Sequence, residues 1–518
     1  MIQRVLRLLS IVLLVSCGAV PAQASDAALE RGTAIIDPLA LRELDHGRFS
    51  LTHIMAPTRS ADTPLLNGQL FALPSMAPVR KALDEEFERY VAGHKAELPG
   101  ATIGVGDSFD FQLFDRALLD STDARFVLSG IVNRMDRAYV LDQSCGEIRL
   151  IYRMTRVAAP AVGELDASPR LPMTLNVVMK AKSPSEAGIS CAELARRWLD
   201  TAKLTETGAE LANKLTAKDG ALASLGPENI DRIETNLQIA HAPKSASRDF
   251  RTDYLMKVFD YDAASSSFVE SPLENQIDRA RLLSDQDFAR DFKSWLLDPV
   301  HFSELDRGTV VIPDRFLLKG AIAVTPVGFA ATDMQPAFGL VAGEDGTKNP
   351  VFSEDDVVTA LKKLAERGVT PLNVQSAAGF ERRLNDISCT GCHQTRGIGG
   401  FHFPGVDWMA AKPSNTLVVP ASPHFFGDQV RRRDILTAFA EAKDPDFSRG
   451  FASRPQLRGS TELAGSEYED GWGAHCYLQH EATAENDASF RSWSCAEGLA
   501  CQVMPPATRM GMCFVKTR

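Results

Sequence analysis

The most informative stretch of the chain is Ser388-Cys389-Thr390-Gly391-Cys392-His393-Gln394. It holds two thiols three positions apart, which one turn of chain brings to the same side, and an imidazole directly after the second thiol. The two residues between the thiols are small, so a flat group can lie close to the backbone. Nine cysteines and ten histidines among 518 residues predict only about 0.003 such matches by chance. The pattern therefore indicates a specific chemistry for Cys389, Cys392 and His393.

This C-x-x-C-H pattern is the attachment signature of a c-type haem, in which both thiols bond to vinyl groups and His393 is an axial ligand of the iron. A structural zinc site needs two further ligands, and the next cysteine along the chain is Cys476. A thioredoxin-like dithiol follows a buried strand, whereas residues 380–387 have the pattern of a polar helix. A plain disulfide is the remaining alternative. We expect one covalently bound haem c, attached through Cys389 and Cys392.

The second axial position of the iron distinguishes electron transfer from chemistry on a bound ligand. His402 lies in Phe401-His402-Phe403 and His424 in Pro423-His424-Phe425, both beside aromatic residues that suit the wall of a haem site. Each histidine is either a second iron ligand or a packing residue. A methionine ligand would raise the reduction potential relative to a second histidine. The other downstream candidates are Met409, His475, His480, Met504, Met510 and Met512.

The first 24 residues have the pattern of a secretory signal peptide. Two arginines precede an apolar run over residues 8–15, and Ala22-Gln23-Ala24 is a small-x-small cleavage site. The alternative is a lipoprotein, because Leu14-Val15-Ser16-Cys17 resembles a lipobox whose cysteine carries a lipid anchor. Neither this run nor any later one approaches the ~20 apolar residues of a membrane-spanning helix. We expect an exported protein, either periplasmic or attached to the outer membrane through Cys17.

Length and composition indicate an ordinary globular protein of several domains. Hydrophobic residues make up 44% of the chain, and 67 acidic against 56 basic residues give a formal net charge of −11. This acidic balance disfavours nucleic acid as a partner. The expected partner is a redox protein, and no oligomeric state is indicated. We expect a signal peptide at 1–24, a mixed strand and helix domain at 25–345, a cytochrome c-like haem domain at 346–455 and a cysteine-rich module at 456–518.

The fold class expected from these patterns is α+β, with an N-terminal region rich in strands. Six apolar runs show partial period-two alternation, which is typical of strands half-buried in an antiparallel sheet. They cover residues 125–135, 147–157, 173–181, 232–240, 254–261 and 309–327. Helices are predicted at 191–202 and 285–297, and an aromatic stripe in the second of these is expected to pack in the core.

The region from 346 to 455 is predicted to be mainly helical. Ser353 is a good N-cap, because three acidic residues and an apolar face follow it, and Gly368 ends this helix. A second helix, from about residue 375, leads into the cysteine motif. Further along, Arg431-Arg432-Arg433 is either a solvent-exposed triplet or a set of partners for haem propionates.

The remaining cysteines predict disulfides, since export places the chain in an oxidising compartment. Cys145 and Cys191 are expected to pair and so to tie the start of the second predicted strand to a helix. The other four lie within the last 43 residues and predict a small disulfide-stapled module with three alternative connectivities. These four are Cys476, Cys495, Cys501 and Cys513.

The haem motif resembles that of c-type cytochromes, and the whole chain looks like a large exported bacterial protein with one C-terminal cytochrome c-like domain. The resemblance rests on Cys389, Cys392 and His393, and it implies a covalent haem in a mainly helical domain. The chain departs from small soluble cytochromes c, because its motif comes late and no methionine-containing loop follows at the usual distance. Dihaem peroxidases carry two such motifs, whereas this chain has one.

Three functions are consistent with a single haem c. The first is electron transfer, with His393 as the proximal ligand and a second ligand from the protein. The second is a peroxidase-type oxidoreductase, with an open distal position and His402 or His424 as the base. The third is a secreted binding protein whose haem is structural or sensory. Electron transfer is the function that we expect.

Overall fold

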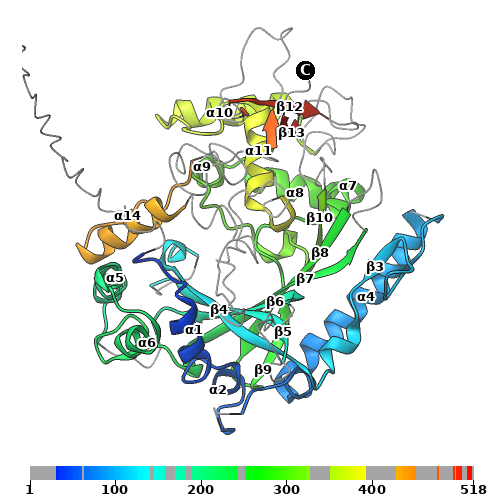
Figure 1. Cartoon of the computed structure of the whole chain (residues 1–518). Helices are drawn as coiled ribbons and strands as arrows, with labels where there is room; N and C mark the ends of the chain where they lie inside the picture. The colour runs from blue at the N-terminus through cyan, green and yellow to red at the C-terminus, as the bar shows by residue number, and fades with distance from the viewer. Residues whose placement is uncertain are drawn as a thin grey trace, which may run out of the picture.

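A computed structural model gives the fold of the chain (Figure 1). The structure describes residues 31–60, 63–97, 99–140, 145–157, 170–182, 188–242, 251–326, 351–391, 428–450, 475–477, 494–495, 497–503 and 510–515.

Ten strands of this described part form one large sheet. Strands β4 to β8 follow one another in both sequence and space, and every pair along this run is antiparallel. β1 lies beside β4 and β10 beside β8, while the parallel pair β2 and β3 joins one end of β7. The strands are β1 (Ala34–Ile35), β2 (Ile103–Gly104), β3 (Phe111–Leu113), β4 (Ala124–Arg134), β5 (Glu147–Arg156), β6 (Arg170–Lys180), β7 (Ile230–His241), β8 (Arg251–Asp262), β9 (Ser267–Ser271) and β10 (Gly320–Pro326).

Five of the six predicted strands are confirmed as β4 to β8, within a few residues at each end. The sixth prediction, over 309–327, is correct only for its last third. β10 begins at Gly320, and the residues before it include the 3₁₀ turn Asp314–Phe316. Pro313 precedes that turn, and a proline has no N–H with which to continue a ladder.

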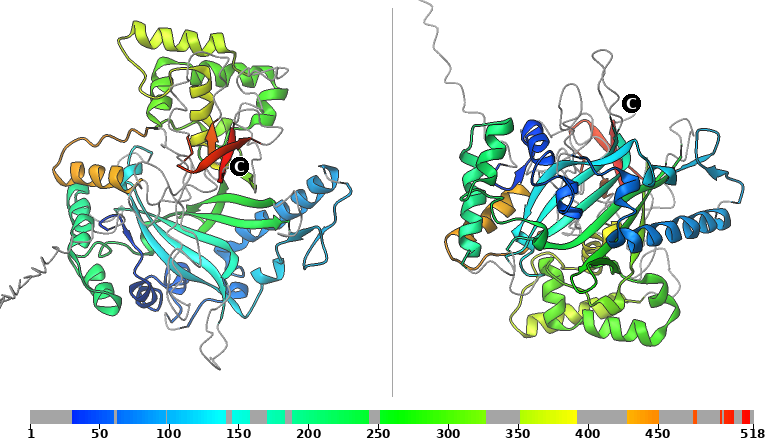
Figure 2. Two further views of the ribbon diagram at one scale, coloured as in Figure 1. Left: turned by 45° about the horizontal axis from the view of Figure 1, so that its top comes forward. Right: turned by 90° about the horizontal axis from the view of Figure 1, so that it is seen from below.

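Period-two alternation gives the sheet two different faces. In β5, Ile148, Leu150 and Tyr152 belong to the main apolar core, whereas Glu147 and Arg149 point to the opposite face. The apolar face is covered by helices from the N-terminal half of the chain (Figure 2). They are α1 (Pro38–Asp45), α2 (Leu51–Met55), α3 (Asn67–Leu70), α4 (Ala77–Glu97), α5 (Cys191–Asp200) and α6 (Gly208–Thr216).

A second group of helices has a separate core on the other side of the sheet (Figure 2). It consists of α7 (Arg279–Ser284), α8 (Gln286–Leu296), α9 (Pro299–Arg307), α10 (Glu354–Glu366) and α11 (Ala377–Ile387). The aromatic stripe of α8 packs in this core as predicted, with Phe292 in edge contact with Phe316 and Phe352. This core draws on residues both before and after position 345, the domain boundary expected from the sequence.

The predicted caps of α10 are confirmed. The Ser353 side chain accepts a hydrogen bond from the Asp356 N–H and the Asp356 carboxylate accepts one from the Ser353 N–H, which is a complete capping box. Gly368 has a φ of +73°, a left-handed conformation that glycine adopts without a steric penalty. The sequence therefore determines both ends of this helix locally.

Helix α11 begins at Ala377, close to the predicted start, but its surroundings differ from the prediction of a polar helix. Glu381, Arg382, Arg383 and Asp386 are all buried. Arg383 donates to the backbone carbonyls of Asp306 and Arg449, at 2.9 and 2.7 Å. Helix α11 is therefore buried over residues 379–387, and Arg383 bonds to backbone carbonyls of two other segments.

Disulfides join segments that are far apart in the sequence. Cys145 and Cys191 pair as predicted and connect the turn before β5 to the start of α5. In the C-terminal module the pairs are Cys476–Cys501 and Cys495–Cys513, one of the three alternative connectivities. They fasten the small antiparallel sheet of β11 (His475–Tyr477), β12 (Leu499–Val503) and β13 (Met510–Val515).

The chain is thus an α+β protein with a large antiparallel sheet, two groups of helices and a disulfide-rich C-terminal segment. No helix in the described part of the chain is both long enough and apolar enough to span a bilayer.

Candidate functional site

The cysteine motif begins where α11 ends. Ser388 has extended backbone angles, which terminate α11, and its hydroxyl accepts a hydrogen bond from the Gly391 N–H at 3.0 Å. That bond is the one a serine N-cap makes with the third residue of a helix. Cys389 is therefore the first residue of a new helical turn. Because residues three apart share a helix face, such a turn suits two cysteines that must react with one flat group.

The side chain of Cys389 packs against the large sheet. It belongs to a small apolar cluster with Met256 and Val258 of β8 and with Ala321 and Ala323 of β10. Its Sγ lies 3.6 Å from the Glu274 carbonyl oxygen. The next residue, Thr390, donates from both its N–H and its hydroxyl to the Gln276 side-chain oxygen. The segment around residues 274–276 therefore fixes the start of the motif on the sheet.

At position 391 only glycine fits, because a side chain would collide with the backbone of α11. A Cβ at this position would lie 2.1 Å from the Asn385 carbonyl oxygen, and that atom cannot move away without disturbing α11. The sequence suggested that small residues leave room for a porphyrin. The structure adds a second reason, because the turn from α11 into the motif closes only over a residue with no side chain.

Cys389 packs against one face of the sheet at β8 and β10. On the same face, β5 and β7 carry charged side chains. Arg149 lies 2.6 Å from a Glu147 oxygen and 3.0 Å from a Glu234 oxygen, and Arg232 of β7 lies 2.8 Å from the other Glu147 oxygen. Glu147 and Arg149 are only 1% and 2% exposed. These charges are therefore internal, and the region depends on their mutual pairing because desolvation would otherwise destabilise it.

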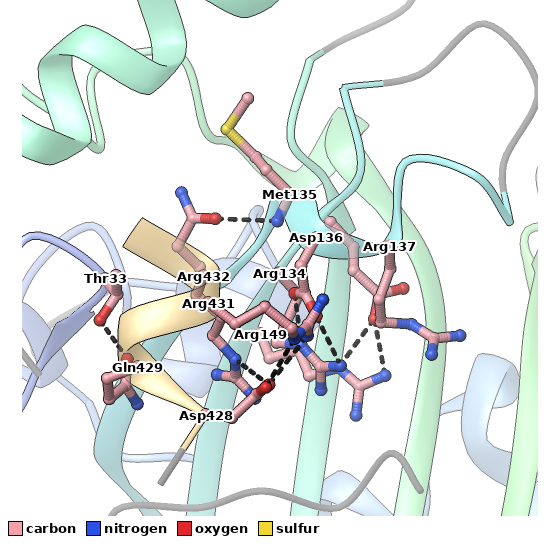
Figure 3. A network of polar contacts seen from close by, with 12 residues as sticks. Thr33, Arg134, Met135, Asp136, Arg137, Arg149, Asp428, Gln429, Arg431 and Arg432 are labelled. Carbon is pink, nitrogen blue, oxygen red and sulfur yellow. Dashed lines mark hydrogen bonds and ion pairs between the residues drawn. The ribbon is translucent and has the colours of Figure 1, made fainter. Parts of the chain in front are cut away.

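A second set of charges lies at the end of β4, where α14 (Gln429–Ala440) packs (Figure 3). Here Asp136 and Asp428 are each held by several arginines. Asp136 lies 2.9 Å from Arg134, 2.7 Å from Arg431 and 3.0 Å from Arg449. Asp428 lies 2.7 Å from Arg431, 2.9 Å from Arg432 and 3.0 Å from Arg449. We call Arg134, Arg431, Arg432 and Arg449 the four-arginine cluster.

The pKa values of these groups reflect a strongly cationic environment. Burial alone would raise the pKa of Asp136, but Arg134, Arg431 and the other arginines hold it well below its usual range. The pKa of Asp428 is lowered in the same way. Burial, and then the neighbouring Arg134, lower the pKa of Arg432 to about 9. Both carboxylates are therefore ionised at neutral pH, and the guanidinium groups repel one another.

A continuous chain of contacts connects the motif with the charged face. The Glu274 carbonyl contacts Cys389, and the Glu274 carboxylate pairs with Arg137. Arg137 in turn lies 3.0 Å from Glu147. Arg137 also directly follows Asp136 in the chain. The same series of contacts therefore extends from the cysteine motif to the four-arginine cluster.

The described part of the chain contains only some of the predicted site residues. Cys389 is described and occupies a capped turn on the sheet. Cys392, His393, His402 and His424, together with Cys17 of the leader, lie outside the described residues. Of the alternative iron ligands, His475 lies in β11, while Met510 and Met512 lie in β13.

The sulfurs of Cys476, Cys495 and Cys513 lie within 4.8 Å of one another, a spacing that would suit a metal ion. All three belong to disulfides, so none is available as a thiolate ligand. These cysteines stabilise the small C-terminal sheet through their disulfides.

Comparison with protein-family models, with curated proteins and with solved structures gives no match for this chain.

Proposed function

We propose that this chain is an exported haem c protein that transfers electrons to a redox partner protein. The proposal rests on the C-x-x-C-H motif, and the observation that supports it best is the capped helical turn that begins at Cys389. Cys389 and Cys392 would hold the haem through thioether bonds, and His393 would be the proximal ligand. When bound, the haem supplies a one-electron Fe(III)/Fe(II) couple.

The residues around the motif fit such a group in three respects. The apolar contacts of Cys389 with β8 and β10 provide a water-poor surface for a largely apolar ring. Gln276 and Glu274 fix the motif against the sheet, which limits reorganisation around the attachment point. Gly391 keeps side-chain atoms away from the turn. Rigid and apolar surroundings of this kind are typical of sites that change oxidation state without changing structure.

Optical spectra test both parts of the proposal. The chain is produced with its leader in a host that attaches haem c, beside a C389S/C392S variant and a C145S/C191S control that removes the same number of sulfurs elsewhere. We expect a haem c spectrum from the wild type and the control but not from the motif variant. Haem-free protein from all three would contradict the attachment.

Addition of cyanide then separates electron transfer from peroxidase chemistry. A low-spin spectrum that does not respond to cyanide, in a protein that is reduced and reoxidised reversibly, is the expected result, because both axial positions are occupied by the protein. A high-spin spectrum that changes with cyanide and reacts with peroxide would overturn electron transfer in favour of the enzyme.

A further inference from the structure

A cavity of about 300 Å³ lies where the end of α1 and the start of α2 meet the start of β4. Its polar wall consists of Asp45, His46, Ser50, Thr52 and Arg125, and its apolar wall consists of Leu51, Pro64, Leu65 and Phe126. His46 and Pro64 are exposed, so the cavity reaches the surface. A space of this size, with apolar walls and a few polar groups, is typical of a binding site for a small molecule. The four-arginine cluster lies at the other end of β4, so this cavity is a separate feature.

Asp45 is a buried carboxylate with few hydrogen-bond donors around it. Its Oδ1 accepts a hydrogen bond from the Leu128 N–H at 3.0 Å, whereas its Oδ2 lies 3.7 Å from Arg125 Nη1, which is beyond hydrogen-bond distance. An ionised carboxylate can accept about four hydrogen bonds, and the described residues supply that single one. The pKa of Asp45, which burial raises to about 6, reflects this shortage of donors. A ligand that donates to Oδ2 would therefore stabilise the ionised side chain.

Arg125 and Ser50 provide donors in the same cavity. The Arg125 side chain is 11% exposed, and the several N–H groups of a guanidinium allow it to bind a carboxylate in addition to its other contacts. Ser50 is buried, and its hydroxyl accepts a hydrogen bond from the His53 N–H at 3.1 Å. The proton of that hydroxyl can still be donated to a ligand. The cavity thus presents an anionic acceptor beside cationic and neutral donors.

The two charges select a ligand that carries both signs. An ammonium group alone, bound at Asp45, would lie beside the Arg125 guanidinium and be repelled by it. A carboxylate alone, bound at Arg125, would be repelled by Asp45 in the same way. Because the two side chains are 3.7 Å apart, an ammonium and a carboxylate on one carbon atom can each reach the partner of opposite charge.

We propose that this cavity binds a free α-amino acid with an apolar side chain. The ammonium group of the ligand donates to Asp45 Oδ2, and its carboxylate accepts from Arg125 and from the Ser50 hydroxyl. The side chain of the ligand packs against the apolar wall, which includes Leu51 and Phe126. Such a ligand explains why a carboxylate that is costly to bury stands in this wall. The site involves neither the cysteine motif nor a haem, so this inference is independent of the proposed function.

Isothermal titration calorimetry of the full chain at pH 7 tests the inference. The probes are L-alanine, L-leucine and L-phenylalanine, and each is compared with two analogues, the amine that lacks its carboxylate and the carboxylic acid that lacks its amine. The variant is Asp45→Asn, which removes the charge and retains an oxygen for the Leu128 N–H. The control is Asp123→Asn, which removes an exposed carboxylate just before β4 and outside the cavity wall.

We expect at least one of the three amino acids to bind equally well to the wild type and to Asp123→Asn. It should bind to Asp45→Asn at least about tenfold more weakly, because a hydrogen bond to a charged group is lost. Both analogues of that amino acid should bind to the wild type at least about tenfold more weakly than the amino acid itself. The analogues need no variant, so they decide the question even if Asp45→Asn does not fold.

Three results would overturn the inference. The first is that none of the three amino acids binds to the wild type. The second is that an amino acid binds to Asp45→Asn as tightly as to the wild type. The third is that an amine or a carboxylic acid binds as tightly as the corresponding amino acid, which would indicate a simple cation or anion site.

Discussion

The two faces of the large sheet bury very different side chains, although both are enclosed by helices. One face packs leucine, isoleucine and phenylalanine against α1 to α6, and the other buries paired arginine and glutamate side chains. Apolar packing needs only volume and shape to match. A buried charged face needs each charge to have a partner in position. The charged face is also the one against which Cys389 packs.

Two buried aspartates show the same difference in their titration. Asp45, at the end of α1, is 4% exposed, and burial raises its pKa to about 6. The nearby Arg125 lowers the pKa but does not offset the effect of burial. Asp45 lies beside a cavity of about 300 Å³. Asp136 is equally buried, yet its arginine neighbours hold its pKa well below the usual range. Burial is therefore common to both residues, and the number of nearby guanidinium groups determines the direction of the shift.

Removing one charge from the arginine site should have the largest effect. We expect Asp136→Asn to lower the free energy of unfolding at pH 7 by about 3–5 kcal/mol, because it removes one of the two carboxylates that pair with these buried guanidinium groups. The lowered pKa of Asp136 stabilises the fold above the unfolded pKa, and this contribution is lost as the pH falls below about 4. Urea unfolding at pH 7 and pH 3 should therefore show a difference between variant and wild type that shrinks in acid. An undiminished difference at pH 3 would contradict the electrostatic explanation.

The matched change on the apolar face is Leu150→Ala. Leu150 is fully buried in the main core and is the sequence neighbour of Arg149 on the other face. We expect a loss of about 2–5 kcal/mol from the cavity and the lost apolar transfer. Since no charge is involved, urea unfolding should give the same loss at pH 7 and pH 3. A strongly pH-dependent loss would show that the two faces are not energetically distinct.

A smaller effect of opposite sign is expected at Asp45. Its folded pKa of about 6 lies above that of an unfolded aspartate, so its contribution to stability is present below about pH 4 and is lost as the pH rises through 6. Asp45→Asn retains an oxygen to accept the Leu128 N–H. We expect this variant to be more stable than wild type by about 1–3 kcal/mol at pH 7 and equal to it at pH 4. Destabilisation at pH 7 would mean that the ion pair with Arg125 outweighs the effect of burial.

The strands were predictable from the sequence because alternation in β5 and its neighbours is strong, and α10 was predictable because Ser353 and Gly368 mark its ends locally. The burial of the charged face was not predictable. Glu147 and Arg149 alternate with apolar residues, and a solvated strand face has the same pattern. The pairing partners come from residues up to 313 positions apart, as for Asp136 and Arg449, and only the fold brings these together.

For the candidate site, too, the sequence predicted the local features but not the contacts between distant residues. The spacing of the cysteines is a local property, and it alone predicts the chemistry proposed for Cys389. The alternative for Arg431 and Arg432 was a solvated triplet. Arg432 is buried and Arg431 half-buried because α14 packs at the end of β4. Neither Asp136 nor Arg449 carries a sequence signal, because isolated charged residues are common on protein surfaces.

The most direct test of the account is the mass of the tryptic peptide 384–396, which contains Cys389, Cys392 and His393 and no other cysteine. In protein matured in a haem c-assembling host, we predict this peptide to carry an adduct of ~616 Da that survives reduction and acid extraction, as thioether-bound haem does. A peptide without the adduct, with its two sulfurs joined in a disulfide or both open to alkylation, would contradict it.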